Sequence, residues 1–245
     1  HLELSKNYSD VISTYQEVEN HFSKWNKTEP NFQIFVEYYL RNLLIPHLEI
    51  NKDNVFLEIG AGSGNFANLL INQYVPKIYF IVDLPESIVN AFVFLSETYP
   101  KAEIILPNSV KDKEYLNEKI KSPFKNKSKI IFITPWQIDL IPENSIYFIS
   151  NKHSFQEMKF SQISNYFEMI NRVSIKEGYF FCVNMVEKIP CGENPFTLDQ
   201  SEPPVRFYEY PWDSENLRLI DEISRFHRLT QADNVAIRLE KIFKN

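Results

Sequence analysis

The chain has 245 residues, a mass of 29.0 kDa, a formal net charge of −6 and a pI of about 5.5. The acidic balance argues against a partner bound through nucleic-acid phosphates, which usually requires a basic face. No apolar run approaches the ~18 residues of a membrane span, and two cysteines make no disulfide framework. Because the opening HLELSKNYSD has neither the basic nor the apolar region of a secretory signal, we expect a cytoplasmic protein.

Residues 1–50 are predicted to form a helical extension of a single domain that covers residues 51–245. Apolar residues recur at three-to-four spacing within 7–27 and within 31–45, which is the pattern of two amphipathic helices. Three roles stay open for these helices: packing against the core, a lid over the mouth of a site, or the contact of a homodimer.

From residue 54 onwards predicted strands and helices alternate, which indicates an α/β domain with a Rossmann-like parallel sheet and helices on both faces. The Pro-rich segment 187–212 is predicted to be a substrate loop. The predicted strands cover residues 54–59, 78–83, 103–106, 129–133, 145–150, 179–185 and 234–242, and the predicted helices cover residues 64–74, 86–98, 110–121, 158–174 and 214–228.

The segment Val55–Leu70, VFLEIGAGSGNFANLL, holds three of the five glycines in the chain: Gly60, Gly62 and Gly64. Glycine permits positive φ and close approach of the backbone, and the following helix start offers free N–H groups. The segment therefore predicts a strand-to-helix turn that binds a nucleotide. The NAD fingerprint places its third glycine three residues after the second, whereas that position here is Asn65.

Asp83 ends the second predicted strand, where a carboxylate can accept hydrogen bonds from both ribose hydroxyls of a nucleotide. The alternative is that Asp83 caps the following helix, because Asp is a good N-cap. Its position directly after the apolar run IYFIV favours the ribose contact.

The pattern E-x-G-x-G-x-G over residues 58–64 resembles motif I of class I S-adenosylmethionine-dependent methyltransferases. Leu84-Pro85 after Asp83 is similar to the D-L-P of many small-molecule O-methyltransferases. With NKHSFQEM at 151–158, Asn184 in YFFCVNM and YPW at 210–212, the chain resembles the sugar O-methyltransferases of bacterial surface-polysaccharide clusters over about residues 50–240.

This resemblance implies that S-adenosyl-L-methionine is the cofactor, that S-adenosyl-L-homocysteine is its product, and that Glu58 binds the amino end of the cofactor. Thr134, Trp136 and Gln137 follow the strand where the adenine is expected, and the Trp136 ring could stack on it. The alternatives are a solvated strand-end carboxylate for Glu58 and a packed loop residue for Trp136. The cofactor-binding candidates are Glu58, Gly60, Ala61, Gly62, Gly64, Asp83, Leu84, Thr134, Trp136 and Asn151.

The loop after 145–150 should face the transferred methyl group, because ligands of open α/β sheets bind beyond the carboxyl ends of the strands. A hydroxyl must lose its proton as it attacks the sulfonium methyl in line, and a positioned base contributes on the order of 10²–10⁴-fold. His153 is the best candidate base, since its imidazole is largely neutral at cytoplasmic pH. Glu157 is a candidate to orient it, and Asp199, followed by His227, is an alternative base.

A sugar or nucleotide-sugar substrate suits aromatic side chains, whose faces fit C–H-rich rings. The substrate-binding candidates are Asn184, Tyr208, Tyr210 and Trp212, and core packing is an equal explanation for each. A magnesium site requires converging oxygen ligands, but Asn151 stands at the strand end and no acidic pair follows it. We therefore expect no metal.

Three other functions stay open. An NAD(P)-dependent nucleotide-sugar oxidoreductase or epimerase would use the Y-x-x-x-K of Tyr115 and Lys119, although a charged, solvated helix explains these residues better. A non-catalytic partner that binds S-adenosylmethionine is the second alternative. A nucleic-acid methyltransferase is the third, and the acidic balance and the lack of an Asn-Pro-Pro-Tyr motif after 145–150 argue against it.

Overall fold

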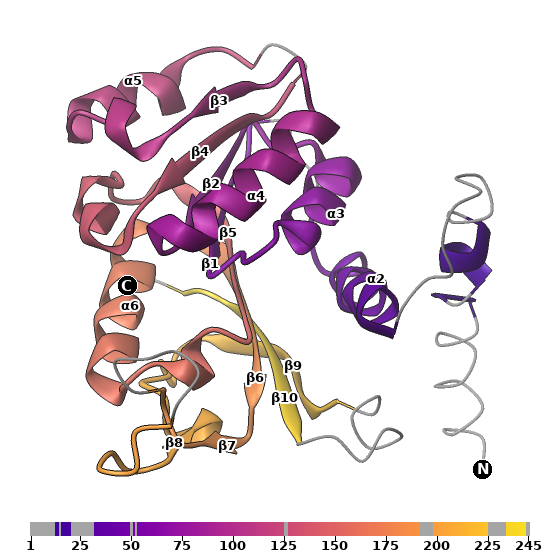
Figure 1. The fold of residues 1–245 in the computed structure, drawn as a ribbon, viewed down its shortest axis with the longest axis vertical. Coiled ribbons are helices and arrows are strands. Elements are labelled where there is room, and N and C mark those ends of the chain that lie inside the picture. The colour runs from indigo at the N-terminus through magenta and orange to yellow at the C-terminus, as the bar shows by residue number, and fades with distance from the viewer. Residues whose placement is uncertain are drawn as a thin grey trace.

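The computed structural model describes residues 13–14, 16–20, 32–49, 51, 53–124, 127–191, 198–224 and 234–243. Within these ranges eight strands form one sheet in the order β3-β4-β2-β1-β5-β6-β10-β9, and β7 and β8 form a separate ladder (Figure 1). The strands are β1 (Val55–Ile59), β2 (Ile78–Val82), β3 (Glu103–Ile105), β4 (Lys129–Ile133), β5 (Ile146–Lys152), β6 (Ser174–Met185), β7 (Glu187–Lys188), β8 (Val205–Arg206), β9 (Leu217–Ile223) and β10 (Val235–Lys241).

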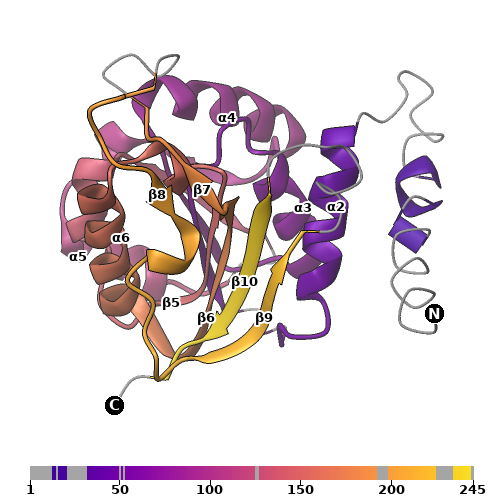
Figure 2. The ribbon, with the colours of Figure 1, turned by 90° about the horizontal axis from the view of Figure 1, so that it is seen from below.

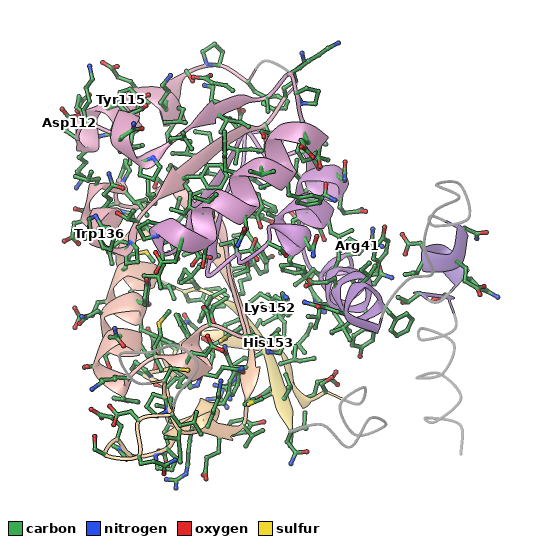
Figure 3. The ribbon with its side chains drawn as sticks, in the orientation of Figure 1. Arg41, Asp112, Tyr115, Trp136, Lys152 and His153 are labelled. Atoms are coloured by element: carbon green, nitrogen blue, oxygen red, sulfur yellow. The ribbon has the colours of Figure 1, made fainter. Side chains whose placement is uncertain are left out.

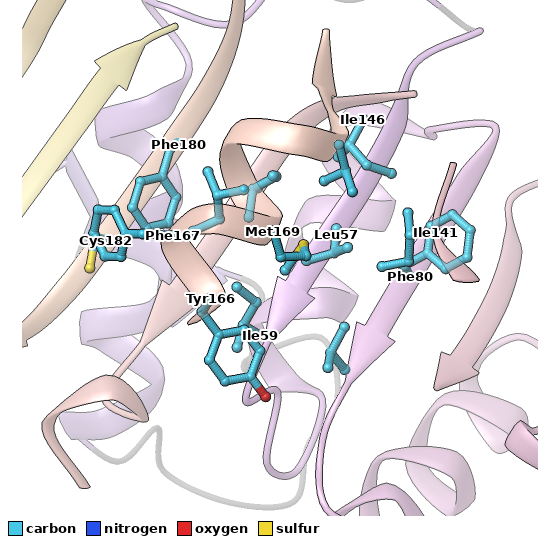
Figure 4. Packing of buried hydrophobic residues seen from close by; sticks show 14 of the residues in the cluster. Leu57, Ile59, Phe80, Ile141, Ile146, Tyr166, Phe167, Met169, Phe180 and Cys182 are labelled. Atoms are coloured by element: carbon cyan, nitrogen blue, oxygen red, sulfur yellow. The ribbon is translucent and has the colours of Figure 1, made fainter. Parts of the chain in front are cut away.

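Helices cover both faces of this sheet, as the sequence predicts (Figure 2). Successive strand residues alternate between two hydrophobic clusters: Leu57 packs in the α6 cluster, and Phe56 packs in the cluster that includes α2, α3 and α4. Figure 4 shows Leu57, Ile146 and Met169 of the α6 cluster. The helices are α2 (Phe32–Leu44), α3 (Asn65–Tyr74), α4 (Pro85–Thr98), α5 (Lys113–Lys121) and α6 (Phe160–Val173), with 3₁₀ turns η1 (Pro107–Ser109), η2 (Pro135–Leu140), η3 (Phe155–Glu157) and η4 (Phe207–Glu209).

The direction in which the chain adds strands reverses at β1. β1 pairs in parallel with β2 on one side and with β5 on the other, and β5 continues in parallel to β6. β10 runs antiparallel to both of its neighbours, β6 and β9. Because ligands of open α/β sheets bind where the strand order reverses, the carboxyl ends of β1 and β5 mark the expected site.

The predicted helix 214–228 is wrong over its described part. Residues 217–223 form β9, which pairs antiparallel with β10 from Ala236↔Ile223 to Lys241↔Leu217. Charged residues in this edge strand resemble the solvated face of a helix, but the ladder with β10 decides the conformation. Residues 225–228 lie outside the described ranges.

Two smaller differences concern the ends of elements. β6 begins at Ser174, earlier than the predicted strand, because Ser174 pairs with Ile146 of β5. α5 begins at Lys113 rather than at 110, because the Asp112 carboxylate accepts a hydrogen bond from the Tyr115 N–H and caps the helix.

The predicted second helix of the extension is confirmed as α2. Of the first predicted helix, residues 13–14 and 16–20 are described and are helical. They contact α2 through an ion pair of Glu17 with Arg41 (2.6 Å) and a hydrogen bond from Asn42 to Thr14 (3.1 Å). Figure 1 shows this segment beside α2, on the side away from the sheet. A lid or a dimer contact stays a prediction.

Candidate functional site

The glycine turn after β1 leaves its backbone uncovered on one side. Gly60, Gly62 and Gly64 all have positive φ, at 73°, 54° and 80°. A Cβ on Gly60 would overlap the Cβ and Oγ of Ser154, whereas a Cβ on Gly62 would have no atom within 4 Å. The turn is therefore closed against the β5 loop at Gly60 and open at Gly62.

Asp83 at the end of β2 binds this turn directly. Its Oδ2 accepts a hydrogen bond from the Gly62 N–H (2.9 Å), and its Oδ1 accepts one from the Leu84 N–H (2.8 Å). Burial raises the pKa of Asp83, and these N–H donors oppose that rise. Leu84 rather than Asp83 occupies the N-cap position of α4, and the Asp83 carboxylate joins the glycine turn to the start of that helix.

Glu58 is not the solvated carboxylate of the alternative interpretation, because only 1% of its surface is exposed. Its Oε2 accepts a hydrogen bond from the Tyr79 hydroxyl (2.8 Å), and its Oε1 has no hydrogen-bond partner among the described residues. Burial raises the pKa of Glu58 to about 7, while the Tyr79 hydrogen bond and the Lys152 charge oppose the rise. The carboxyl group is thus buried, and one of its oxygens has no donor among the described residues.

A second buried carboxylate lies close to Glu58 and comes from the extension. Glu37 of α2 forms an ion pair with Lys152 at the end of β5 (2.6 Å), and both side chains are largely buried. Oε2 of Glu37 has no hydrogen-bond partner within the described part of the chain. The sequence analysis missed both residues, because Glu37 stands inside an apolar helical stripe and no local pattern links it to residue 152.

His153 follows β5 and has a φ of +61°, in the left-handed region that favours glycine. Its N–H donates to the Val183 carbonyl (2.8 Å), and its Nδ1 lies 3.5 Å from Oε1 of Gln156. Unfavourable backbone conformations of this kind persist only where the surroundings hold them, and they cluster at functional sites. Figure 3 shows His153 next to Lys152 at the centre of the molecule.

Asn151 and Asn184 connect the turn at His153 to the neighbouring strands through hydrogen bonds. Both are fully buried. The Asn184 amide donates to Oδ1 of Asn151 (2.8 Å), and the Asn151 amide donates to the Ile59 carbonyl (3.0 Å). The Gln156 N–H donates to Oδ1 of Asn184 (3.1 Å). The two asparagines, predicted to touch cofactor and substrate, thus join β1, β5 and β6 beneath the site.

The other two acidic candidates have partners of their own. Glu157 is exposed and forms an ion pair with Lys188 (3.4 Å). Asp199 accepts hydrogen bonds from the Ser201 hydroxyl (2.5 Å) and N–H (3.1 Å), which hold the pKa of this carboxyl below its usual range. A lower pKa makes Asp199 a weaker base than an imidazole. His227 lies outside the described residues.

The three residues after β4 that could contact the adenine differ in their surroundings. Trp136 is exposed, whereas Thr134 and Gln137 are hydrogen-bonded to each other. Oε1 of Gln137 accepts hydrogen bonds from the N–H and the hydroxyl of Thr134 (both 3.0 Å), which caps η2. Trp136 is 69% exposed, so it is not the packed loop residue of the alternative interpretation. It lies at the side of the molecule, apart from His153 (Figure 3).

The substrate candidates beyond Asn184 lie in and beside an aromatic cluster. Tyr210 is buried, and the Trp212 indole N–H donates to the Phe207 carbonyl (2.8 Å). The Arg238 guanidinium lies 4.3 Å from the centroid of the Trp212 ring. Tyr208 alone among these aromatic candidates is 46% exposed. Packing accounts for the buried Tyr210 and for the partly buried Trp212, and Tyr208 is the most exposed of these three rings.

Tyr166 of α6 lies near the end of β1, and the sequence analysis does not single it out. Burial and the negative charge of Asp83 raise the pKa of Tyr166 to about 12. Figure 4 shows its ring beside Ile59, at the end of β1. In the sequence Tyr166 belongs to the apolar stripe of α6, so periodicity alone assigns it to the core.

No group of three or more His, Cys, Asp or Glu side chains in the described ranges is placed to hold a metal ion. No helix in those ranges has the length and apolar character needed to cross a membrane. Metal independence stays a prediction.

No protein-family model and no curated protein sequence matches the chain. Solved structures do resemble it. A chain from the complex of the Haloferax volcanii Trm112 methyltransferase activator with a methyltransferase is 11% identical, with a TM-score of 0.52 over 85% of this chain and 90% of that one. An S-adenosylmethionine-dependent methyltransferase from Methanosarcina mazei is 11% identical, with a TM-score of 0.52 over 82% and 98%.

The PH0226 protein from Pyrococcus horikoshii is 14% identical, with a TM-score of 0.50 over 82% of this chain and 87% of that one. At these identities the likeness concerns the fold. Together with the strand order, it confirms that the chain has the Rossmann-like fold of class I methyltransferases.

Proposed function

We propose that the protein transfers a methyl group from S-adenosyl-L-methionine to a hydroxyl group of a sugar. The observation that carries this proposal is the hydrogen bond from the Gly62 N–H to the Asp83 carboxylate. This hydrogen bond connects the glycine turn, which is open at Gly62, to the Asp83 carboxylate, which can accept hydrogen bonds from ribose hydroxyls. The His153 turn lies at the end of the neighbouring strand β5, where the strand order reverses.

The residues present fit the proposed cofactor. Gly62 is exposed with no atom in the place of its missing side chain, so a ligand can approach the backbone there. Asp83 would hold the ribose, and the exposed Trp136 ring would stack on the adenine. The unpartnered Oε1 of Glu58 would accept a hydrogen bond from the amino end, directly or through water. When bound, S-adenosylmethionine supplies a methyl group on a positively charged sulfur.

His153 acts as the general base in this proposal. Its neutral imidazole removes the proton of the acceptor hydroxyl while the oxygen attacks the methyl carbon in line, so the O–C bond forms as the C–S bond breaks. A positioned base contributes on the order of 10²–10⁴-fold, and alignment of the reactants contributes up to ~7–11 kcal/mol in ideal cases. The left-handed backbone conformation of His153 is held by the hydrogen bond from its N–H to the Val183 carbonyl. In this proposal that conformation orients the imidazole towards the acceptor hydroxyl.

A sugar acceptor is proposed from the resemblance of residues 151–158 and 210–212 to sugar O-methyltransferases. The 46% exposure of Tyr208 supports it, because an accessible aromatic ring suits the C–H face of a sugar. The acceptor is either a nucleotide-linked sugar or a surface-polysaccharide precursor, and the acceptor experiment below tests the nucleotide-linked form.

The NAD(P)-dependent alternative gains no support from the position of Tyr115 and Lys119. Both lie on α5, and Lys119 forms an ion pair with Glu103 of β3 (2.6 Å). β3 is an edge strand of the sheet, and three strands separate it from β5. Figure 3 shows Tyr115 far from His153. No observation favours a non-catalytic role over catalysis, and the experiment below separates the two.

The test is incubation with S-adenosylmethionine labelled in its methyl group and a panel of nucleotide sugars, with calorimetry of S-adenosylmethionine and NAD(P) alongside. We expect S-adenosylmethionine to bind and label to reach one sugar class. Binding without transfer to any acceptor would favour the non-catalytic role, and binding of NAD(P) alone would overturn the proposal. Full activity after EDTA treatment would support metal independence, and gel filtration tests the proposed dimer.

A further inference from the structure

A cluster of three charged side chains, Glu37, Glu58 and Lys152, lies between α2 and the sheet. Successive strand residues alternate between the two faces of the sheet, so Glu58 shares a face with Phe56, which packs in the same hydrophobic cluster as Leu40 of α2. Glu37 precedes Leu40 by three residues and lies on the same side of this helix. Lys152 of β5 joins the cluster through its ion pair with Glu37 (2.6 Å).

The two carboxylates of this charged cluster are close enough to influence each other. Burial raises the pKa of Glu58 to about 7, and the negative charge of Glu37 contributes to this rise. Only 3% of the surface of Glu37 and 1% of the surface of Glu58 are exposed. Because one lysine accompanies two carboxylates, the cluster carries one excess negative charge when both carboxylates are ionised.

Each of the two carboxylates also has one oxygen without a donor. Oε1 of Glu37 accepts from Lys152 (2.6 Å), and Oε2 of Glu58 accepts from the Tyr79 hydroxyl (2.8 Å). Oε2 of Glu37 and Oε1 of Glu58 have no hydrogen-bond partner within the described part of the chain. Buried polar atoms are paired in the great majority of cases, because burial without a partner costs free energy. The two unpartnered oxygens thus lack a donor that carries a positive charge.

We propose that Glu37 and Glu58 together bind the ammonium group at the amino-acid end of the cofactor, so that α2 is part of the cofactor site. The inference rests on the cofactor of the proposed function and adds to it a residue of the extension. An ammonium group has one positive charge and three N–H donors, so it can donate to both unpartnered oxygens and balance the excess negative charge. Glu58 precedes Gly60 by two residues, so a ligand that crosses the open turn at Gly62 lies next to it.

Lys152 indicates the side from which the ligand enters. Both unpartnered oxygens are closed to solvent, whereas 14% of the Lys152 side chain is exposed. Lys152 follows Asn151, which pairs with Ile59 at the end of β1, so it lies beside the glycine turn. The carboxylate of an amino-acid end is bonded to the same carbon as the ammonium group, and the Lys152 ammonium attracts it. Binding therefore requires the Glu37–Lys152 pair to shift and brings each charge of the ligand to an opposite charge.

The test compares two ligands that differ only in the amino group: S-adenosyl-L-homocysteine and its analogue with hydrogen in place of that group. Calorimetry measures the Kd of each ligand for the wild type and for Glu37→Gln, which removes the charge and keeps the size of the side chain. We expect Glu37→Gln to raise the Kd of S-adenosyl-L-homocysteine about tenfold, because a hydrogen bond between charged groups is lost. The Kd of the analogue should change less than about twofold. An equal rise for both ligands would overturn the inference.

Glu17→Gln is the matched control. Glu17 also forms an ion pair with a residue of α2, Arg41 (2.6 Å), but it belongs to the segment on the side of α2 away from the sheet. This variant should leave the ratio of the two Kd values unchanged.

A second variant covers the case in which Glu37→Gln does not fold. That substitution leaves the Lys152 charge without its buried partner, which is strongly destabilising, whereas Glu37→Gln combined with Lys152→Met removes both charges. Both ligands keep their carboxylate, so the loss of Lys152 affects them alike. The ratio of the Kd of the analogue to that of S-adenosyl-L-homocysteine should fall about tenfold in the double variant. An unchanged ratio would contradict the inference.

These outcomes separate the inference from the proposed function. A Kd ratio that depends on Glu37, in a protein that transfers no methyl group, would refute methyl transfer and leave the ammonium site intact. A Kd ratio that does not depend on Glu37, in a protein that methylates a sugar, would overturn the ammonium site alone and leave Glu37 as the structural partner of Lys152. Failure of S-adenosyl-L-homocysteine to bind the wild type would overturn both.

Discussion

The two sides of the switch point are built differently. We call the ends of β1 and β2 the glycine half, and the ends of β5 and β6 the amide half; the former consists of residues 60–64 and Asp83, and the latter of Asn151, His153, Gln156 and Asn184. The glycine half uses main-chain N–H groups and one carboxylate, as in the Gly62–Asp83 hydrogen bond. The amide half uses buried side-chain amides to hold one strained histidine.

The two halves differ in how easily they can be predicted from the sequence. A turn with positive φ at three alternate positions favours glycine, so the turn of the glycine half is visible within five residues of the sequence. The amide half depends on a hydrogen bond between Asn151 and Asn184, which are 33 residues apart. Substitutions can therefore test whether one half serves binding and the other serves the proton transfer, beginning with the largest expected effect.

His153→Asn should separate the halves most strongly. Asn tolerates positive φ, so the fold should be kept, while kcat should fall by about 10²–10⁴ because the base is lost. Single-turnover methyl transfer measures the rate, and calorimetry should show unchanged affinity for S-adenosylmethionine. Methyl transfer at the wild-type rate would remove His153 from the mechanism.

Gly60→Ala should disrupt the close contact between Gly60 of the glycine half and Ser154, which follows β5. The new Cβ would overlap Ser154, and the alanine would have to adopt a positive φ. Overpacking and left-handed backbone strain together cost ~2–5 kcal/mol. Gly62→Ala is the control, because its Cβ meets no atom within 4 Å and only the strain of ~1–2 kcal/mol applies. Urea denaturation measures both. Equal destabilisation would show that the contact with Ser154 is relaxed in solution.

Glu58 should make stability depend on pH. Its pKa is about 7 in the folded protein against 4.5 as the ordinary value, so the folded state binds the extra proton. Its contribution to stability is fully present below pH 4.5 and is lost as the pH rises through about 7, a change on the order of 3 kcal/mol. Unfolding free energies of the wild type and Glu58→Gln from pH 4.5 to 8 measure this. Parallel curves would contradict a buried Glu58.

Asp83→Asn should weaken the glycine half without affecting the amide half. Loss of the charge weakens the hydrogen bonds from Gly62 and Leu84 and the proposed ribose contact, so the Kd of S-adenosylmethionine should rise about tenfold to a hundredfold. Asp112→Asn, which changes the cap of α5, should leave that Kd unchanged. A wild-type Kd in Asp83→Asn would place the ribose elsewhere.

Trp136→Ala should have the smallest effect. The ring is 69% exposed, so stability should change by less than about 0.5 kcal/mol. Base stacking on aromatic rings is worth ~1–3 kcal/mol per base in single-stranded nucleic-acid sites, and we expect the lower end of this range for so exposed a ring, which is about a fivefold rise in the Kd of S-adenosylmethionine, as measured by calorimetry. No change in this Kd would mean that the adenine does not stack on Trp136.

Most of the sheet could be predicted from the sequence, because β1, β2 and β4 are buried on both faces and appear as short apolar runs. The edge strand β9 was predicted as a helix, because its exposed charged residues obscure the strand pattern and its partner β10 follows it in the chain. The sequence places Gly62 and Asp83 near one nucleotide, since strand ends of a parallel sheet meet at one edge, but it does not predict the hydrogen bond between them.

The sequence by itself determined the class of the fold and the bare turn after β1. Both follow from local properties, namely apolar periodicity and a backbone that only glycine adopts readily. Only the tertiary structure decided that Gln156 faces His153 and that Glu37 of α2 reaches Lys152, 115 residues away. Such contacts depend on strand order and register, and a polar side chain buried by distant elements leaves no pattern among its neighbours in the chain.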